Sequence, residues 1–182
     1  MSRRESRTRY AVLGALSIEP MSGSEVHALA TGPLAHFWHE GFGQIYPTLR
    51  TLEAEGHVVT TSEPGVRGSR RRVHALTASG WSELRGWLAR PVGPVAPGRD
   101  ELLLKVFLGR HVDPDVLLGH LRTRRQALAV ALERYAAIAA ELAQDASPDV
   151  PWWGRTLGHG VAVASASLAW CDATIAELSV AP

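Results

Sequence analysis

Residues 43–56 read GQIYPTLRTLEAEG, a stretch that predicts an amphipathic helix. Ile45, Leu49 and Leu52 fall at positions i, i+4 and i+7, so they share one helical face. The polar side chains between them point to the opposite face. Gly56 then provides a C-terminal stop. The stretch therefore predicts a helix with one buried side and one polar side.

Two other helices are expected before this one. Residues 8–17 carry apolar side chains on nearly every turn, and Ser22 followed by Glu25 matches the S-x-x-E capping box that opens a helix. In the third helix, Pro47 is tolerated if it lies in the first turn, where few intrahelical N–H bonds are lost. We therefore expect the third helix to begin just after Gly43.

A β-hairpin and one more helix are expected after it. Residues 57–63 and 70–76 are rich in Val and Thr, and the glycine-containing segment 64–69 joins them, which is the pattern of two strands and a tip. Residues 77–90 then predict a helix. Three helices, a hairpin and a helix are the element order of a winged helix-turn-helix domain, in which the hairpin is the wing.

A segment rich in proline and glycine, residues 91–99, separates this part from the rest of the chain. Residues 1–90 hold eleven Arg and eight Asp or Glu, a net charge of +3, whereas residues 91–182 hold eight Lys or Arg and ten Asp or Glu, a net charge of −2. The whole chain carries only +1, too little for DNA binding driven by overall charge. We therefore expect a DNA-binding domain at 1–90, a linker at 91–99 and a second domain at 100–182.

The second domain is expected to be wholly helical, with helices at about 100–109, 113–144 and from 151 onward. A helix over 113–144 would be roughly 48 Å long, more than a domain of this size needs. Apolar residues recur along the last two helices, which predicts a dimerisation seam. The seam residues are Leu121, Leu128, Leu132, Tyr135, Leu157, Val161, Leu168 and Ile175. The alternative is an antiparallel pair within one chain, in which the two helices cover each other.

Arginines gather at and beside the hairpin tip. They are Arg67, Arg70, Arg71 and Arg72. No acidic residue occurs between Glu63 and Glu83. Guanidinium groups stay charged and donate paired hydrogen bonds to phosphate, so this density suits contact with the DNA backbone. An isolated run of this kind is more often a solvated surface, but the preceding helix-turn-helix pattern favours the DNA-binding interpretation.

The quoted stretch and its neighbours resemble the PadR family of bacterial transcription regulators. The most specific part is the I-Y-P-x-L-x-x-L-E-x-x-G pattern at 45–56, and YAVLG at 10–14, PMSG at 20–23 and LTASG at 76–80 also fit. In the second domain, DELLLKVF at 100–107 and a Trp-rich last helix are similar to the α-helical dimerisation domain of the family's larger subgroup. The resemblance covers nearly the whole chain and implies a homodimeric repressor that a small molecule releases from DNA.

The DNA-reading residues are expected on the third helix, with the wing arginines anchoring the DNA backbone. The third-helix residues are Gln44, Tyr46, Pro47, Thr48 and Arg50. Two-fold symmetry then requires an inverted-repeat operator in double-stranded DNA. Two positions depart from the family pattern, which usually has Tyr where this chain has Ser24 and Gly-Arg-Pro in the wing where this chain has Gly-Ser-Arg at 68–70.

Aromatic residues of the second domain point to an effector site, expected between the two domains. The lining residues are Trp152, Trp153, His159 and Trp170. Flat side chains stack on planar aromatic molecules, and His159 or Arg155 can pair with a carboxylate or phenol. Part of this expectation comes from the resemblance, because PadR-like proteins respond to phenolic and drug-like compounds. The alternative is that these tryptophans only fill a helical interface.

Enzymatic motifs such as G-x-S-x-G, G-x-x-x-x-G-K-[ST] and H-E-x-x-H are absent, so we expect no catalytic residues and no cofactor. His36 and His39 have the spacing of metal ligands, but the aromatic pair between them favours a packed helix end, and no metal site is expected. The single Cys171 fits the cytoplasm. The charge-free stretch 156–171 is too short to span a membrane. The competing class is a winged-helix module that binds protein rather than DNA.

Overall fold

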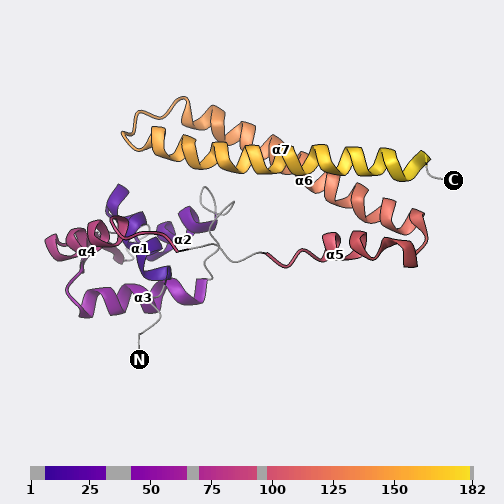
Figure 1. The fold of residues 1–182 in the computed structure, drawn as a ribbon. Helices are drawn as coiled ribbons and strands as arrows, with labels where there is room; N and C mark the ends of the chain where they lie inside the picture. Colours follow the sequence, from indigo (N-terminus) through magenta and orange to yellow (C-terminus); the bar gives the residue numbers. More distant parts are fainter. Residues whose placement is uncertain (1–6, 32–41, 65–69, 94–97, 181–182) are drawn as a thin grey trace. The chain divides into compact units, whose positions relative to one another are not determined.

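The computed structural model describes residues 7–31, 42–64, 70–93 and 98–180. The chain divides into two compact units, residues 1–93 and 94–182 (Figure 1). The division falls inside the segment 91–99 that is rich in proline and glycine. Each unit has its own cluster of buried apolar side chains.

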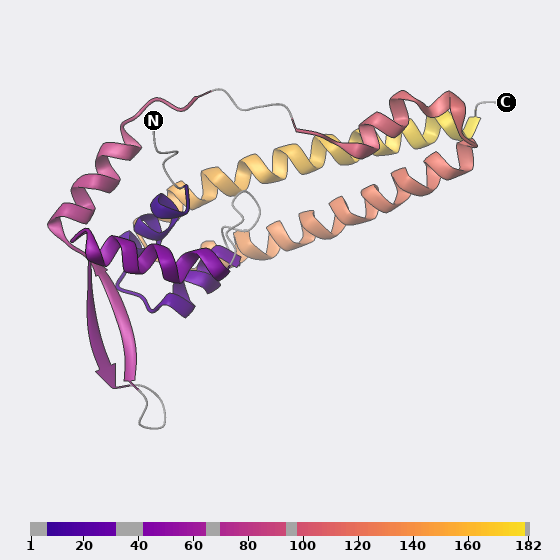
Figure 2. The same cartoon turned by 90° about the horizontal axis from the view of Figure 1, so that it is seen from below.

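The first unit is a winged helix-turn-helix. Its elements in chain order are α1 (Arg7–Ile18), α2 (Gly23–Thr31), α3 (Phe42–Ala54), β1 (Val58–Pro64), β2 (Arg70–Leu76) and α4 (Ala78–Leu88). The strands pair antiparallel, from Val58 opposite Leu76 to Pro64 opposite Arg70. Figure 2 shows this hairpin extending away from the helices as a wing. The expected fold class, mainly α with a small β-hairpin wing, is confirmed.

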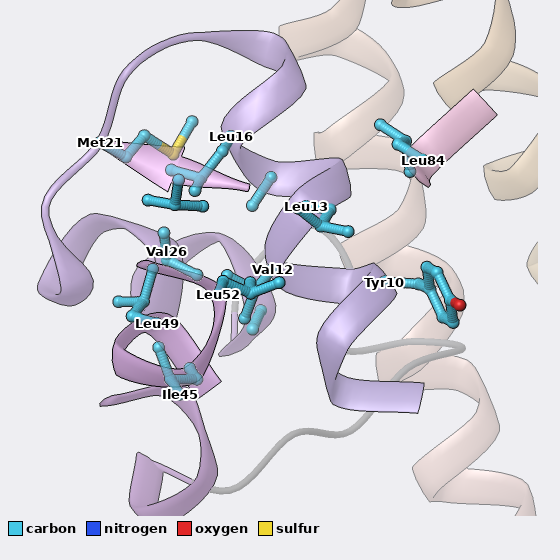
Figure 3. Packing of buried hydrophobic residues seen from close by; sticks show 13 residues of the cluster. Tyr10, Val12, Leu13, Leu16, Met21, Val26, Ile45, Leu49, Leu52 and Leu84 are labelled. Carbon is cyan, nitrogen blue, oxygen red and sulfur yellow. The ribbon is translucent and has the colours of Figure 1, made fainter. Parts of the chain in front are cut away.

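One apolar core holds the helices of this unit together (Figure 3). Leu13 of α1 is completely buried, and Ile45, Leu49 and Leu52 of α3 are buried beside it. These are the α3 positions that the i, i+4, i+7 spacing predicts. Full burial of such a side chain contributes about 1.5–3 kcal/mol. The buried face therefore fixes the rotation of α3 and turns its polar side outward.

The start of α3 differs from the sequence prediction. The helix begins at Phe42, so Pro47 is its sixth residue, and the prediction that Pro47 lies in the first turn is wrong. Proline has no N–H to donate to the carbonyl four residues earlier, which belongs to Gly43. Both Gly43 and Pro47 are exposed, so water can hydrogen-bond to that carbonyl. This solvation explains why α3 tolerates a proline inside it.

The first turn of α2 forms the expected capping box. The Ser22 backbone N–H donates to the Glu25 carboxylate at 2.8 Å, and the Glu25 N–H donates to Ser22 Oγ at 3.4 Å. Just before this turn, Met21 and His74 of β2 exchange two backbone hydrogen bonds of 3.0 and 2.8 Å. This isolated bridge attaches the base of the wing to the start of α2.

In the second unit, residues 98–180 form α5 (Glu101–Phe107), the short 3₁₀ helix η2 (Gly109–His111), α6 (Pro114–Leu142) and α7 (Val150–Val180). The long helices α6 and α7 lie side by side and run antiparallel (Figures 1 and 2). Asp100 caps α5, and its carboxylate also accepts two hydrogen bonds of 2.9 and 3.0 Å from the Arg124 guanidinium. This pair ties α5 to α6.

Several predicted dimerisation residues form a seam between α6 and α7 within one chain. Leu121 of α6 is buried, as are Leu157 and Cys171 of α7. The half-buried members are Leu128, Leu132, Tyr135, Leu168 and Ile175, and Val161 is exposed. The intrachain antiparallel pair that the sequence left open is therefore present. Leu121 of α6 and Cys171 of α7 belong to one buried cluster, against which Leu128 and Ile175 pack, so these side chains stabilise the pair within the single chain.

One described helix, α7, is long and apolar enough to cross a membrane by length and composition alone. The expectation from sequence considered only the sixteen charge-free residues 156–171, whereas the helix extends over 31 residues. A single helix of this kind is weak evidence for a membrane span. Here the apolar seam of α7 faces α6, so the helix has a packing partner within its own unit.

Candidate nucleic-acid interface

The exposed side of α3 carries the polar residues that the sequence predicts for DNA reading. Gln44, Pro47 and Arg50 follow one another at intervals of three residues and are all exposed. Positions at this spacing lie close together on a helix surface. Since Ile45, Leu49 and Leu52 are buried, the exposed residues point away from the core. This side of α3 has the amide and guanidinium groups that hydrogen-bond to base edges and phosphates.

Tyr46 and Thr48 are less accessible than the other predicted reading residues. Thr48 is half-buried, and the Tyr46 ring packs over Gly23, the first residue of α2. A Cβ atom at Gly23 would lie 2.6 Å from Cε1 of that ring, so only glycine allows this approach. Tyr46 is 37% exposed. It therefore contributes to the packing of α3 against α2 as well as to the surface.

The described wing arginines all have partners within the first unit. Arg70 Nε donates a 2.8 Å hydrogen bond to the Ser62 hydroxyl. Arg71 forms an ion pair with Glu25 of α2, and Arg72 lies 3.3 Å from the Glu53 carboxylate of α3. Arg67 lies outside the described residues. Two of the four predicted wing arginines thus contact the helices of the helix-turn-helix.

An open hollow of about 350 Å³ lies where α2, α3 and β2 meet. Its ionisable lining residues are Glu25, Arg50, Glu53, Arg71, Arg72 and His74. In the described part of the chain, Arg50 has no carboxylate within ion-pair distance, whereas Arg71 and Arg72 each have one. As far as the described residues show, Arg50 is therefore the guanidinium in this hollow that has no carboxylate partner.

Two titratable groups of this region have shifted pKa values. Hydrogen bonds from the Ser22 backbone and from Arg71 lower the pKa of Glu25 to about 2. Burial lowers the pKa of His74, and the neighbouring Arg72 charge lowers it further. His74 Nδ1 lies 2.9 Å from the Thr60 hydroxyl, so the neutral ring keeps a hydrogen-bond partner. At neutral pH this region therefore holds a Glu25 carboxylate and an uncharged His74.

Comparison with known proteins assigns the family. Residues 12–86 match the family described as "Transcriptional regulator PadR-like family", and residues 98–179 match "Virulence activator alpha C-term". The "Negative transcriptional regulator PadR" of Bacillus subtilis is 31% identical over 126 residues, which are 66% of this chain and 68% of that protein. This chain belongs to the PadR family. As a PadR-like transcriptional regulator it is a DNA-binding protein and not an enzyme, as the sequence predicts.

Solved structures of PadR-like proteins share the fold over almost the whole length of this chain. The crystal structure of Bacillus subtilis PadR in complex with operator DNA has a TM-score of 0.83 and 23% identity, covering 93% of this chain and 98% of that one. The structure of the same protein in complex with p-coumaric acid has a TM-score of 0.78 and 22% identity, covering 95% and 99%. These likenesses extend the PadR architecture to both units described above.

The residues predicted to bind an effector all lie on α7 of this PadR-like chain, but they do not converge. Trp152 is 66% exposed, and the Arg155 guanidinium lies 4.7 Å from the centre of its ring. Trp153 is half-buried and His159 is exposed. Trp170 is eighteen residues from Trp152, which is about 27 Å along a helix. Within one chain, Trp170 therefore belongs to a different surface from Trp152 and Trp153.

Sequence reasoning missed three residues that shape the interface. Glu25 was recognised only as a helix cap, although it also binds Arg71, 46 positions later. Glu53 and Gly23 were assigned no role, yet one pairs with Arg72 and the other supports Tyr46. The sequence held one weak indication that Glu25 and Glu53 pair with the wing. Residues 70–76 contain three arginines and no acidic residue, so acidic partners have to come from other elements. The partners themselves depend on the tertiary fold.

Two minor expectations concern single residues. Cys171 is completely buried in the seam, and burial raises the pKa of its thiol, so it is a packed core residue as predicted. His36 and His39, the pair with metal-ligand spacing, lie outside the described residues. Among the residues that the structure describes, no cluster of three potential metal ligands occurs.

Proposed function

We propose that this PadR-like regulator is a homodimeric repressor that binds an inverted-repeat operator through α3 and is released by a small aromatic effector. The observation that carries the proposal is the exposed face of α3 with Gln44, Pro47 and Arg50, where Arg50 lines a hollow with the wing and has no carboxylate partner among the described residues. The negative regulation named for its Bacillus subtilis relative supports repression. A transcriptional regulator acts where the DNA is, so the cytoplasm is the proposed location.

The proposed mode of binding places the start of α3 in the major groove. Gln44 has the amide that pairs with an adenine edge, and Arg50 reaches guanine or phosphate. The wing then lies along the neighbouring DNA backbone. Among the described wing arginines, Arg70 is the one bonded to a hydroxyl, that of Ser62, rather than to a carboxylate, so it is the cation proposed to contact phosphate. Two copies related by a two-fold axis read two half-sites, which requires the inverted repeat.

Dimerisation is supported by apolar side chains that the second unit leaves exposed. These are Leu103, Leu104, Phe107 and Leu108 near α5, Val130 of α6, and Val163 and Trp170 of α7. A soluble monomer rarely exposes so many large apolar side chains together. A second copy of the chain covers them in the proposed dimer, so α7 has protein rather than lipid around it.

The effector is proposed to bind at the N-terminal end of α7. Trp152 and Trp153 supply aromatic surface, Arg155 already lies over the Trp152 ring, and His159 is two turns away. A carboxylate on a planar aromatic molecule suits this set, since the ring stacks on tryptophan and the anion pairs with arginine. The p-coumaric acid complex of Bacillus subtilis PadR supports this ligand class.

The test is an electrophoretic mobility shift with the upstream DNA of the protein's own coding region and a random fragment of equal length. We expect tighter binding to the upstream fragment, and release when a hydroxycinnamic acid is added. Trp152→Phe should weaken the ligand effect, whereas the exposed Gln126→Ala on α6 serves as the control because that residue lies in neither the proposed effector site nor the proposed dimer interface. Equal binding to both fragments would exclude operator recognition, and equal release of both variants would place the effector elsewhere.

A further inference from the structure

The first turn of α2, residues 22–25, contacts both elements that are proposed to bind DNA. Its Glu25 binds Arg71 of the wing, and its Gly23 supports the Tyr46 ring of α3. Capping of α2 requires neither of these two contacts. We propose that this turn sets the angle between the wing and α3, and that Arg71 is a positioning residue held by Glu25 rather than a contact to DNA phosphate. The inference rests on the proposed use of α3 and the wing.

The Glu25 carboxylate is the centre of this arrangement. Its Oε2 atom accepts hydrogen bonds from the Ser22 backbone N–H and the Ser22 hydroxyl, both at 2.8 Å, and from Nη2 of Arg71. Three donors on one oxygen fix the carboxylate and keep it ionised, consistent with its low pKa. The Arg71 guanidinium is therefore both oriented and neutralised before any DNA arrives.

The wing needs such a support because a two-stranded hairpin is only marginally stable alone. The backbone bridge between Met21 and His74 holds β2 at its inner part. Arg71 adds a second attachment three residues closer to the tip. The Arg72–Glu53 ion pair attaches the same strand to α3, so the bridge holds the inner part of β2 while the two ion pairs, one to α2 and one to α3, define the direction of the hairpin.

The helix α3 packs against the same turn. The Tyr46 ring lies so close to Gly23 that a Cβ atom there would be 2.6 Å from Cε1 and 3.0 Å from Cζ. Because Glu25 is two residues further along this turn, displacement of the turn moves the support of α3 and the support of the wing together. The turn therefore contributes to the geometry of the DNA-binding surface from both sides, in addition to the direct Arg72–Glu53 pair between the wing and α3.

The difference in ion pairing between Arg71 and Arg50 agrees with this role. A cation that contacts phosphate releases a counterion from DNA, which makes binding more sensitive to salt. Arg71 would have to break its ion pair with Glu25 to do so, whereas Arg50 has no carboxylate partner among the described residues. We therefore expect the salt dependence to come from Arg50 and not from Arg71.

The experiment compares Arg71→Gln, Glu25→Gln and the double variant in the full-length protein, with Arg50→Gln as the control. Gln at position 25 keeps the capping box but loses the charge that holds Arg71. Each single variant should weaken binding to the upstream DNA about two- to fivefold, the range of an exposed ion pair, and the double variant should be no weaker. The slope of log affinity against log salt should stay at the parent value, whereas Arg50→Gln should lower it by about one.

Hydrogen exchange of the DNA-free protein provides a second readout. Arg71→Gln and Glu25→Gln should speed exchange of the outer hairpin amides, and Arg50→Gln should not. The proposal is overturned if Arg71→Gln lowers the salt slope by about one while Glu25→Gln tightens binding, because Arg71 then contacts phosphate. It is also overturned if melting temperatures fall while hairpin exchange and affinity stay unchanged. If the parent protein does not bind DNA, the proposed function fails, and the exchange rates still decide whether Glu25 holds the wing.

Discussion

Single residues of the first unit show how closely its elements approach. Gly80 of α4 lies against the backbone carbonyl of His57, and a Cβ atom at position 80 would overlap that oxygen. Backbone cannot move aside as a flexible side chain can. Gly86 in the same helix has open space around it. A close backbone contact therefore requires glycine at position 80, whereas no contact requires it at position 86.

Replacing each of them by alanine tests this difference. Gly80→Ala should destabilise the first unit by about 1–3 kcal/mol, because α4 must shift away from the connection between α3 and β1. Gly86→Ala should stabilise it by roughly 0.5–1 kcal/mol through higher helix propensity. Urea denaturation followed by circular dichroism measures both changes. A Gly80→Ala variant as stable as the parent would contradict the close approach.

Glu25 gives a prediction about pH. Its pKa is about 2 in the folded protein and 4.5 in an ordinary environment, so the folded state favours the ionised form. The resulting stabilisation is complete above about pH 5 and is lost as the pH falls towards 2. The difference in unfolding free energy between the parent and Glu25→Gln should be constant near pH 6 and shrink below pH 5. His74 titrates in both proteins, so its effect cancels. A difference that stays constant down to pH 3 would contradict the shifted pKa.

At the scale of elements, the sequence was sufficient to predict the α-helices and both strands of the described chain, but not the short 3₁₀ helix η2. Local patterns caused this success: Ile45, Leu49 and Leu52 mark a helix face, and Ser22 with Glu25 marks a helix start. The start of α3 was misplaced because Pro47 was taken as a first-turn residue. Partners distant in sequence, such as Glu25 and Arg71, follow no local pattern and needed the fold.

The exposed face of α3 leads to a prediction about DNA sequence preference. Gln44→Ala should cost about 1–3 kcal/mol of operator binding and relax the preference at particular bases, because an amide pairs with specific base edges. Arg50→Ala should weaken operator and random DNA more evenly. Binding to a set of operator variants with single base changes measures the preference. If Gln44→Ala weakens operator and random DNA by the same factor, Gln44 does not read bases.

At the scale of the whole molecule, the central question is what covers the apolar side chains of the second unit. The helices α6 and α7 extend over 29 and 31 residues, about 43 and 46 Å at the helical rise. Their mutual seam buries Leu121 and Cys171, yet Phe107 of α5 remains 85% exposed. The heptad pattern alone could not separate the intrachain seam from a dimer interface, since both use the same spacing.

A charge placed at Phe107 distinguishes these two surfaces. Phe107→Glu leaves the α6–α7 seam untouched, so the helical content and the fold of each chain should persist. In a dimer interface the glutamate loses water without gaining a partner, so the protein should become monomeric at micromolar concentration. Its operator affinity should fall steeply, because one half-site alone must then support binding. Light scattering after size exclusion, with exposed Gln126→Glu on α6 as the control, measures the oligomeric state. A parent chain that is already a monodisperse monomer under these conditions would rule out the homodimer, and a dimeric Phe107→Glu variant would place the interface away from α5.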